Sequence, residues 1–101
     1  MAKGYWIGRV DVTDMDAYKT YVAANGPAFA KFGGRFLVRG GRQETVEGTA
    51  RSRNVVIEFE SYEQALACYR SPEYVAAMNL RMKAAVADMI VIEGYDGPQP
   101  V

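Results

Sequence analysis

Residues 53–64 read RNVVIEFESYEQ, and this stretch decides the fold because it joins a strand directly to a helix. Residues 53–60 are rich in β-branched and aromatic side chains, which is typical of a half-buried strand. Ser61 follows, and Gln64 comes three residues later, which matches the capping box that begins many helices. The chain therefore passes from a strand into a helix at Ser61.

On the C-terminal side, this helix is predicted to restart at Ser71. The serine can cap a new segment, Pro72 suits the first helical position, and Glu73 lies near the positive end of the helix dipole. Residues 89–94 then predict the last strand, and residues 96–101 predict a polar tail rich in chain breakers. The core-facing side chains expected of the restarted helix and its end are Val75, Met78, Met82 and Ala85.

On the N-terminal side, residues 5–12 alternate in the manner of a strand, and Thr13 or Asp14 can cap the helix that follows. Pro27 interrupts this helix, because proline lacks an N–H donor and clashes with the preceding turn. We therefore expect the helix to be kinked or split at that point. The side chains of its apolar stripe are Met15, Tyr18, Val22, Phe29 and Phe32.

A glycine pair at residues 33–34 ends that helix, and residues 35–39 form the next strand before a glycine-bearing loop over residues 40–52. The order is strand, helix, strand, strand, helix, strand. It predicts an α+β, ferredoxin-like β-α-β-β-α-β fold, with an antiparallel sheet in the order 4-1-3-2 and two helices on one face. We expect one domain over residues 1–95 and a flexible C-terminal tail over residues 96–101.

The two faces of the predicted sheet differ in what covers them. The face against the helices is predicted to carry Trp6, Val10, Phe36, Val38, Val55, Ile57, Phe59, Ile90 and Ile92. The opposite face is predicted to carry Tyr5, Ile7, Leu37, Val56, Met89 and Val91. At about 1.5–3 kcal/mol for each large apolar side chain, leaving the second set in water would lose on the order of 10 kcal/mol. We therefore expect a homodimer that packs sheet against sheet, which is a dimeric α+β barrel.

Polar residues on that second face are the candidate binding residues. Burying any of them alone is costly, so they must be paired or contact a ligand. The sheet order lets Glu58 reach Arg9 or Arg39, and lets Glu93 reach Arg9. One interpretation is a small pocket in which a guanidinium fork holds a carboxylate or enolate and Glu58 carries a proton. The other is an ion-pair network that only fixes the register of the dimer. Tyr69, beside the helix break, could add a phenol at the mouth of a cleft, but amphipathic packing is the favoured role for a tyrosine at such a break. The predicted ligand-binding residues are Arg9, Arg39, Asn54, Glu58 and Tyr69.

A second group of arginines surrounds the loop over residues 40–52. An anionic ligand could be clamped there, but Glu44 and Glu47 lie in the same stretch. A solvated hairpin with local charge balance is therefore favoured. The arginines are Arg35, Arg39, Arg42, Arg51 and Arg53.

The composition argues against several classes of protein. The 101 residues include 12 basic and 12 acidic side chains, and this zero net charge argues against nucleic-acid and membrane-surface binding. No histidine is present, so we expect no metal site, no haem and no cofactor. Cys68 is the single cysteine, which fits a core thiol in a reducing cytoplasm. No apolar run approaches the roughly 20 residues that cross a bilayer.

Five motifs carry a resemblance to a known family. They are GGRFLVRGG at residues 33–41, EG at 47–48, VIEF at 56–59, YRSPEY at 69–74 and EG at 93–94. In these motifs the chain resembles the uncharacterised DUF1330 family over nearly its whole length. The resemblance implies a ferredoxin-like fold of the dimeric α+β barrel superfamily in small bacterial cytoplasmic proteins, and it implies no particular activity. That superfamily includes antibiotic-biosynthesis-type monooxygenases, haem-degrading enzymes, lactone isomerases and sensory domains of transcription factors.

The sequence thus indicates a small cytoplasmic homodimer that binds a small anionic or carbonyl metabolite. A cofactor-free enzyme of the proton-transfer or oxygenase type fits this interpretation. The alternative is a non-catalytic ligand-binding or interaction domain whose arginine–glutamate network is structural, so whether the protein is an enzyme stays open.

Overall fold

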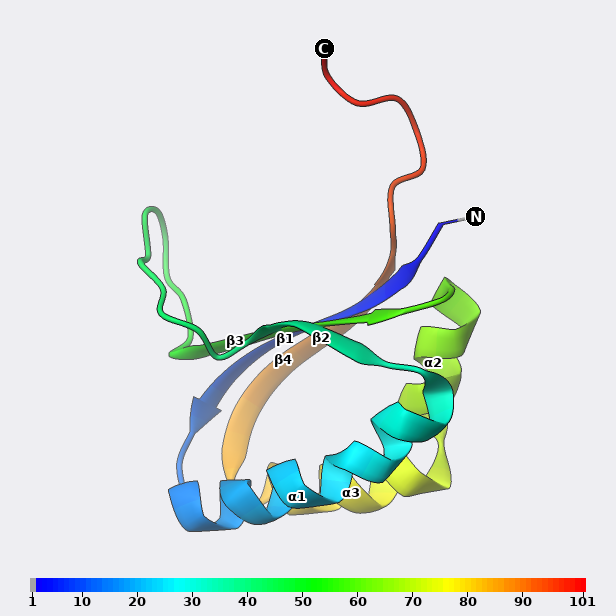
Figure 1. Ribbon diagram of the computed structural model, residues 1–101. Coiled ribbons are helices and arrows are strands. Elements are labelled where there is room, and N and C mark those ends of the chain that lie inside the picture. Colours follow the sequence, from blue (N-terminus) through cyan, green and yellow to red (C-terminus); the bar gives the residue numbers. More distant parts are fainter. Residues whose placement is uncertain (1) are drawn as a thin grey trace.

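A computed structural model describes residues 2–101 and shows one four-stranded antiparallel sheet with the helices on one of its faces (Figure 1). The strand order β2-β3-β1-β4 is the predicted order read from the other edge, so the predicted α+β ferredoxin-like fold is confirmed. The elements along the chain are β1 (Gly4–Val12), α1 (Met15–Phe32), β2 (Arg35–Arg39), β3 (Arg53–Phe59), α2 (Tyr62–Arg70), α3 (Pro72–Met82) and β4 (Ala85–Glu93).

The helices begin at residues that the sequence predicts as caps. Asp14 and Ser61 each accept a hydrogen bond of 3.1 Å from the backbone N–H three residues further on. Ser71 follows α2 and caps α3 by accepting from the backbone N–H of Tyr74 at 3.1 Å. The predicted break in the second helix is therefore confirmed, and it gives the domain three helices.

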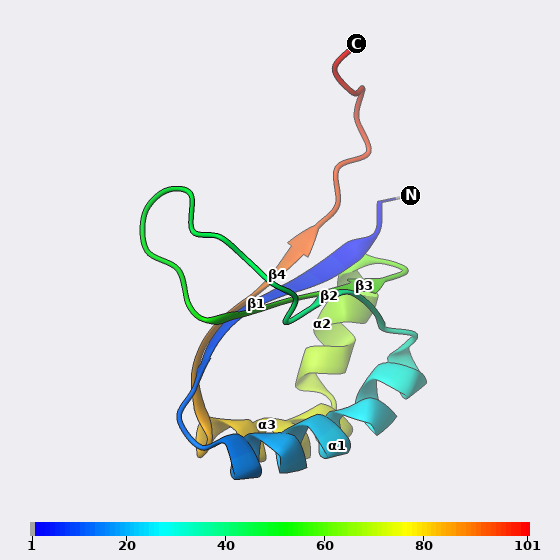
Figure 2. The same cartoon turned by 60° about the vertical axis from the view of Figure 1, so that its left-hand side comes forward.

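Pro27 does not split α1, which is one uninterrupted helix of 18 residues. Its later half turns toward the sheet in Figures 1 and 2, and it ends at Gly33, whose φ of 72° is left-handed. Because α1 packs along α3, tertiary contacts outweigh the local cost of a proline inside a helix. Within residues 2–101, no helix is both long and apolar enough to span a membrane.

The pairing of β4 with β1 corrects the predicted faces of the last strand. We call the side of the sheet away from the helices the outer face. Val91 pairs with Trp6, which is buried against the helices, so Met89 and Val91 lie on the helix side. Ile90 and Ile92 consequently lie on the outer face, which is the reverse of the prediction. The predicted alternation between the two faces was shifted by one residue along this strand, and such a shift moves every side chain to the other face.

A bulge in β2 corrects a second pair of predictions. Phe36 lies on the helix side as predicted, but the register shifts between Phe36 and Val38. An extra residue in one strand reverses the alternation beyond it. Val38 therefore lies on the outer face and Arg39 on the helix side, where the sequence predicted the opposite for each.

The core lies between the sheet and the helices, with Trp6 at its centre. The Trp6 ring packs edge-on against Phe29 and Tyr74, with ring centroids 5.2 and 4.7 Å away. Its indole Nε1 donates to the backbone oxygen of Ala65 at 2.8 Å. The core is thus aromatic and includes a satisfied buried donor.

The buried stripes of the helices differ from the predicted ones. Met15, predicted to lie in the stripe of α1, is 57% exposed, and Met82, predicted to face the core, is 64% exposed. Val75 also lies at the surface. Polar groups enter the core instead. The buried residues are Tyr18, Tyr21, Asn25, Ala28 and Phe29 in α1, and Tyr74, Ala77 and Arg81 in α3.

An apolar row crosses the uncovered outer face. Ile7 pairs with Val56 on one side and Ile90 on the other, and Val56 pairs with Val38, so one row spans all four strands. Val38 is 43% exposed and Ile90 is 53% exposed. The loop over residues 40–52 and the tail after β4 both extend on this side of the sheet (Figure 2). The outer face is therefore apolar at its centre and flanked by two projecting segments.

Cys68 lies in α2 and is fully buried, with its Sγ 3.7 Å from the backbone oxygen of Ala28. Burial, followed by the nearby charge of Glu73, raises the pKa of the Cys68 thiol to about 12. Since the thiolate is the reactive form, we expect iodoacetamide at pH 8 to alkylate the folded protein at least about 100-fold more slowly than the urea-unfolded chain. Mass spectrometry of timed aliquots measures both rates, and similar rates would contradict this placement.

Candidate functional site

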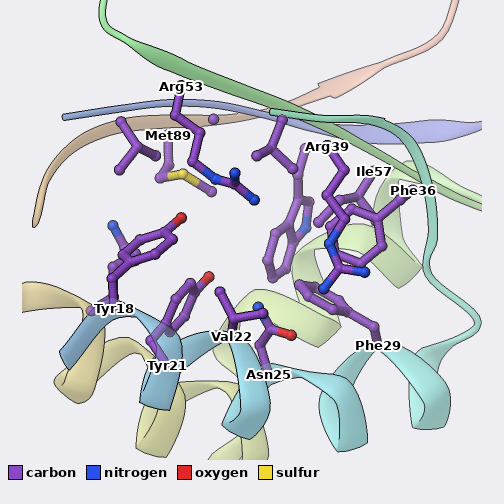
Figure 3. A pocket seen from close by; sticks show the side chains of 15 residues that line it. Tyr18, Tyr21, Val22, Asn25, Phe29, Phe36, Arg39, Arg53, Ile57 and Met89 are labelled. Carbon is purple, nitrogen blue, oxygen red and sulfur yellow. The ribbon is translucent and has the colours of Figure 1, made fainter. Parts of the chain in front are cut away.

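A small pocket lies between the helix side of the sheet and α1 (Figure 3). Its roof is the row in which Arg39, Val55, Gly8 and Met89 are neighbours across the four strands. Gly8 has no side chain, and a β-carbon placed there would come within 2.7 Å of the Met89 Sδ. Gly8 therefore leaves room for the Met89 side chain, and both residues line a cavity of about 30 Å³.

Three arginines from three elements line this pocket: Arg39 of β2, Arg53 of β3 and Arg81 of α3. Arg39 is exposed, Arg53 is half-buried and Arg81 is only 5% exposed. Among the described residues, no Asp or Glu lines the pocket and none of the three arginines has a carboxylate within 4.0 Å. The pocket therefore has a concentrated positive charge without a matching acid.

Aromatic rings and a glycine hold these guanidinium groups in place. Arg39 stacks on the Phe36 ring at 4.0 Å, and Arg53 lies 5.6 Å from the Tyr18 ring. A β-carbon at Gly40 would collide with the Nη1 of Arg53, so a larger residue in this turn would displace the guanidinium. In Figure 3 the Arg53 side chain descends from the sheet toward Tyr18, which rises from α1.

Two buried arginine nitrogens have no partner. Within residues 2–101, the Nε atoms of Arg53 and Arg81 are buried and their N–H groups donate to no acceptor. A buried N–H without an acceptor costs about 1–3 kcal/mol, and more on a charged group. A bound anion would offset the charge of these two guanidinium groups, whereas burying a further apolar group would not.

The opposite wall of the pocket is phenolic. Tyr21 is 6% exposed, and its hydroxyl lies 2.8 Å from the hydroxyl of Tyr74, which stands behind it in α3. Burial is the main cause that raises the pKa of Tyr21 and of Tyr74 above that of a free phenol. Both groups therefore stay protonated at neutral pH and act as neutral hydrogen-bonding groups.

Of the five predicted binding residues, the structure places Arg39 in this pocket and the other four elsewhere. Arg9, Asn54 and Glu58 lie on the outer face, separated from the pocket by the sheet, because strand alternation puts them on the side opposite Gly8 and Val55. Arg39 reaches the helix side only through the bulge in β2. The structure therefore does not bring the five residues together.

The predicted pairs between arginine and glutamate on the outer face do not form. Glu58 accepts a hydrogen bond from the Tyr5 hydroxyl at 3.1 Å and lies 3.5 Å from Arg35. Arg9 instead lies 3.9 Å from Asp88. Glu93 pairs with Gly4 and therefore lies on the helix side of the sheet, where it is exposed. The sequence predicted it on the outer face, and the one-residue shift in β4 explains the difference.

Tyr69 packs in the aromatic core. Its ring lies edge-on to Trp6 at 5.3 Å and beside Tyr74 at the same distance. It does not line the pocket, so its role in this structure is packing next to the pocket wall.

Sequence reasoning did not place four polar residues in the pocket, although the sequence contains a signal for two of them. The four are Tyr21, Asn25, Arg53 and Arg81. Asn25 and Arg81 follow buried aromatic residues at helical spacing, seven residues after Tyr18 and Tyr74 respectively. A polar group inside an otherwise apolar stripe indicates an internal hydrogen-bond site. Nothing comparable marks Arg53, which resembled the solvated arginines of the loop.

A second hollow, of about 240 Å³, lies on the outer face beneath the long loop. Arg51 of that loop contacts Asp11 and Asp88, each at 2.8 Å, and Arg9 joins Asp88. Hydrogen bonds from the Ser52 backbone N–H and from Arg51 hold the pKa of Asp11 below its usual value. Two arginines balance two aspartates there, so this cluster fastens the loop to the sheet and offers no net charge to a ligand.

Comparisons with known proteins agree with this fold. The family model described as a domain of unknown function, DUF1330, matches residues 3–95. No curated protein matches the chain. Two crystal structures of the RPA0582 protein of unknown function from Rhodopseudomonas palustris, one of them methylated, are similar with TM-scores of 0.72 and 0.78. They are 21% and 17% identical, cover 98% and 97% of this chain, and are themselves covered to 85% and 84%.

A third solved structure is similar over the whole chain. It is SnoaB, a cofactor-independent oxygenase from Streptomyces nogalater, with a TM-score of 0.63 and 10% identity. The match covers 100% of this chain and 98% of SnoaB. At such low identities these three structures show the shared fold, and the roles of individual residues have to be argued from this chain.

Proposed function

Because this chain belongs to the DUF1330 family, a domain family of unknown function, we propose from its own residues that it binds a small anionic or carbonyl metabolite in the pocket beneath Gly8. One observation carries the proposal: Arg39, Arg53 and Arg81 all line one pocket that no carboxylate lines in the described part of the chain. Like charges repel most strongly where water is excluded, and an anion reverses the sign of that interaction.

The ligand group that fits best is a carboxylate or enolate. A guanidinium presents planar N–H groups that match the two oxygens of a carboxylate. The cavity of about 30 Å³ has room for about two waters, so it suits a compact anionic head. Arg39 is exposed at the rim, so the rest of a larger metabolite would extend outward past its side chain.

An enzymatic role is the second candidate, and Tyr21 favours it. Tyr21 could donate a hydrogen bond, or a proton, to an oxygen that gains negative charge. Since neither an acid nor a histidine lines the pocket among the described residues, a substrate for cofactor-free proton-transfer or oxygenase chemistry would have to arrive already as its anion. The similarity of the fold to SnoaB, described as a cofactor-independent oxygenase, is compatible with this role. A non-catalytic ligand-binding or interaction domain is the alternative.

We also propose that the protein is a homodimer joined through its outer faces. The row of Val38, Val56, Ile7 and Ile90 supports this proposal, because a second copy would remove four apolar side chains from water. A dimer of this kind in the bacterial cytoplasm also suits the single buried thiol, Cys68.

Removing the rim arginine tests the binding site. We expect Arg39→Ala to weaken the binding of acetate and pyruvate at least about tenfold, since a charged hydrogen bond contributes about 1.5–3 kcal/mol. Isothermal titration calorimetry at pH 7 measures the affinities, and circular dichroism confirms that the variant is folded.

Arg42→Ala is the matched control, because it removes an exposed arginine three residues away that does not line the pocket. We expect it to leave both affinities unchanged within twofold. Equal affinities in the wild type and Arg39→Ala, or no binding of either carboxylate to the wild type at 50 mM, would place the site elsewhere or remove it.

A further inference from the structure

The loop over residues 40–52 has a base in which its two limbs are tied to each other. The backbone N–H of Gly40 donates to the backbone oxygen of Asn54 at 2.9 Å. Gln43 donates to the backbone oxygen of Arg51, also at 2.9 Å, and accepts a hydrogen bond from the side chain of Asn54. The first residues of the loop are therefore bonded to the last ones.

The returning limb is also fastened to the outer face of the sheet. Arg51 contacts Asp11 of β1 and Asp88 of β4, each at 2.8 Å, and the backbone N–H of Ser52 donates to Asp11 at 2.9 Å. The Arg51 side chain is only 28% exposed, so water and salt screen these contacts less than they screen ion pairs on the open surface. Because the base is held to two strands, the direction in which the loop leaves the sheet is fixed.

The tip of the loop has no comparable support. Among the described residues, 44–50 make no hydrogen bond and no ion pair. Val46 lies in this stretch and is 85% exposed. Ordering such a segment costs conformational entropy, and no polar contact within its own chain offsets that cost. The base therefore fixes the direction of a tip whose own chain gives it little to contact.

The direction of the loop brings its tip to the flank of the outer face. In Figure 2 the loop leaves on the side of the sheet away from the helices, where the tail after β4 also extends. The apolar row through Val38 and Ile90 lies on the same side. A second copy packed on that row would have the loop of the first copy beside it. In a two-fold dimer the same contact is made twice, once by each loop.

We propose that the loop over residues 40–52 is an arm that contacts a second copy of this chain, with Val46 packed on the partner subunit. This inference rests on the homodimer proposed above and adds a second contact surface to it. A second copy is the favoured occupant because the apolar row lies beside the arm. A charged partner is disfavoured, since Arg9 and Arg51 already balance Asp11 and Asp88 at the base of the arm.

Val46→Asp tests the arm without altering the sheet. The substitution places a charge in the proposed contact of both arms, so we expect the dissociation constant of the dimer to rise at least about tenfold. Analytical ultracentrifugation over a range of micromolar concentrations measures this constant. Val46 is exposed within its own chain, so the variant should keep the circular dichroism spectrum of the wild type.

Val75→Asp is the matched control, because it makes the same change at another exposed valine, which lies in α3 on the helix side of the sheet. We expect it to leave the dissociation constant unchanged within about twofold. A dissociation constant for Val46→Asp that is also within about twofold of the wild type would overturn the arm.

Amide hydrogen exchange gives a second measurement. The backbone N–H groups of residues 44–50 have no acceptor in their own chain among the described residues, so any protection of them has to come from the partner subunit. We expect their exchange to be at least about fivefold slower in the wild-type dimer than in Ile7→Asp, which carries a charge at the centre of the apolar row. Equal exchange rates in the two proteins would contradict the arm.

The failures of the two proposals are distinguishable. A wild-type dimer that dissociates in Ile7→Asp but not in Val46→Asp would leave the sheet-to-sheet dimer standing and remove the arm. A monomeric wild type, or a dimer that survives Ile7→Asp, would remove both.

Discussion

Replacing Ile7 with aspartate is expected to convert the proposed dimer into monomers. Ile7 lies on the outer face in the middle of the sheet, directly between Val56 and Ile90. In a sheet-to-sheet dimer the new carboxylate would be buried against the partner, and each buried unpaired charge costs several kcal/mol. Two copies per dimer therefore weaken association by several hundredfold or more. In the monomer the carboxylate faces water, so the fold itself should persist.

Analytical ultracentrifugation over a range of micromolar concentrations measures this effect against the 11.2 kDa mass of one chain. Val75→Asp is the matched control, since Val75 lies at the surface of α3 on the other side of the sheet, and that variant should remain dimeric. A wild type that sediments as a monomer throughout would remove the dimer, and a dimeric Ile7→Asp would move the interface to another surface.

Replacing Trp6 with alanine is expected to cost the domain most of its stability. The ring is 1% exposed and sits among four other aromatic rings, with centroids 4.7–5.4 Å away. Truncating a buried tryptophan costs about 3–5 kcal/mol, and the Ala65 oxygen would also lose the indole N–H that it accepts. A small domain has a free energy of unfolding of only about 5–15 kcal/mol, so this loss is a large share of the stability of the domain.

Urea titration followed by far-UV circular dichroism at one protein concentration measures this loss, since the variant has no tryptophan fluorescence. Trp6→Phe keeps a ring in the core but loses the indole N–H, so its destabilisation should be about half as large. A loss below 1 kcal/mol in Trp6→Ala would mean that the centre of the core lies elsewhere.

Local signals predicted the architecture well because each one acts within a few residues. The cap at Ser61, the restart at Ser71 and the glycine pair after Phe32 satisfy backbone groups of the same turn, and the structure has all three where the sequence places them. The strand order then follows from how short connections can cover a sheet.

Local signals did not show which residues of β2 and β4 face the helices and which face outward. Residues 89–92 are all apolar, so their alternation has no polar residue to fix which face is buried. Asp88 lies on the outer face with Ile90 and Ile92, and a strand beginning at Ala85 would have supplied that reference. The bulge in β2 depends on pairing with β3, which no local pattern encodes.

The candidate site was predicted in part and for a different surface. Arg39 was recognised as a guanidinium that needs a partner, but the undetected bulge left it on the wrong side of the sheet. Arg81 and Tyr21 come from different helices, and only the packing of α1 on α3 brings them to one cavity. The assembly of a site from several elements is a tertiary property, which is why the sequence could not place this pocket.

The glycine in the roof of the pocket gives a criterion for comparing chains that share this fold. Gly8 sits in β1, where a β-carbon would come within 2.7 Å of the Met89 Sδ and would push the Met89 side chain toward the cavity. Such a chain would keep the same sheet, the same caps and the same arginines, yet have a filled interior. We therefore expect relatives with a larger residue at this position to lack the proposed binding cavity, and an alignment can identify them before any ligand is known.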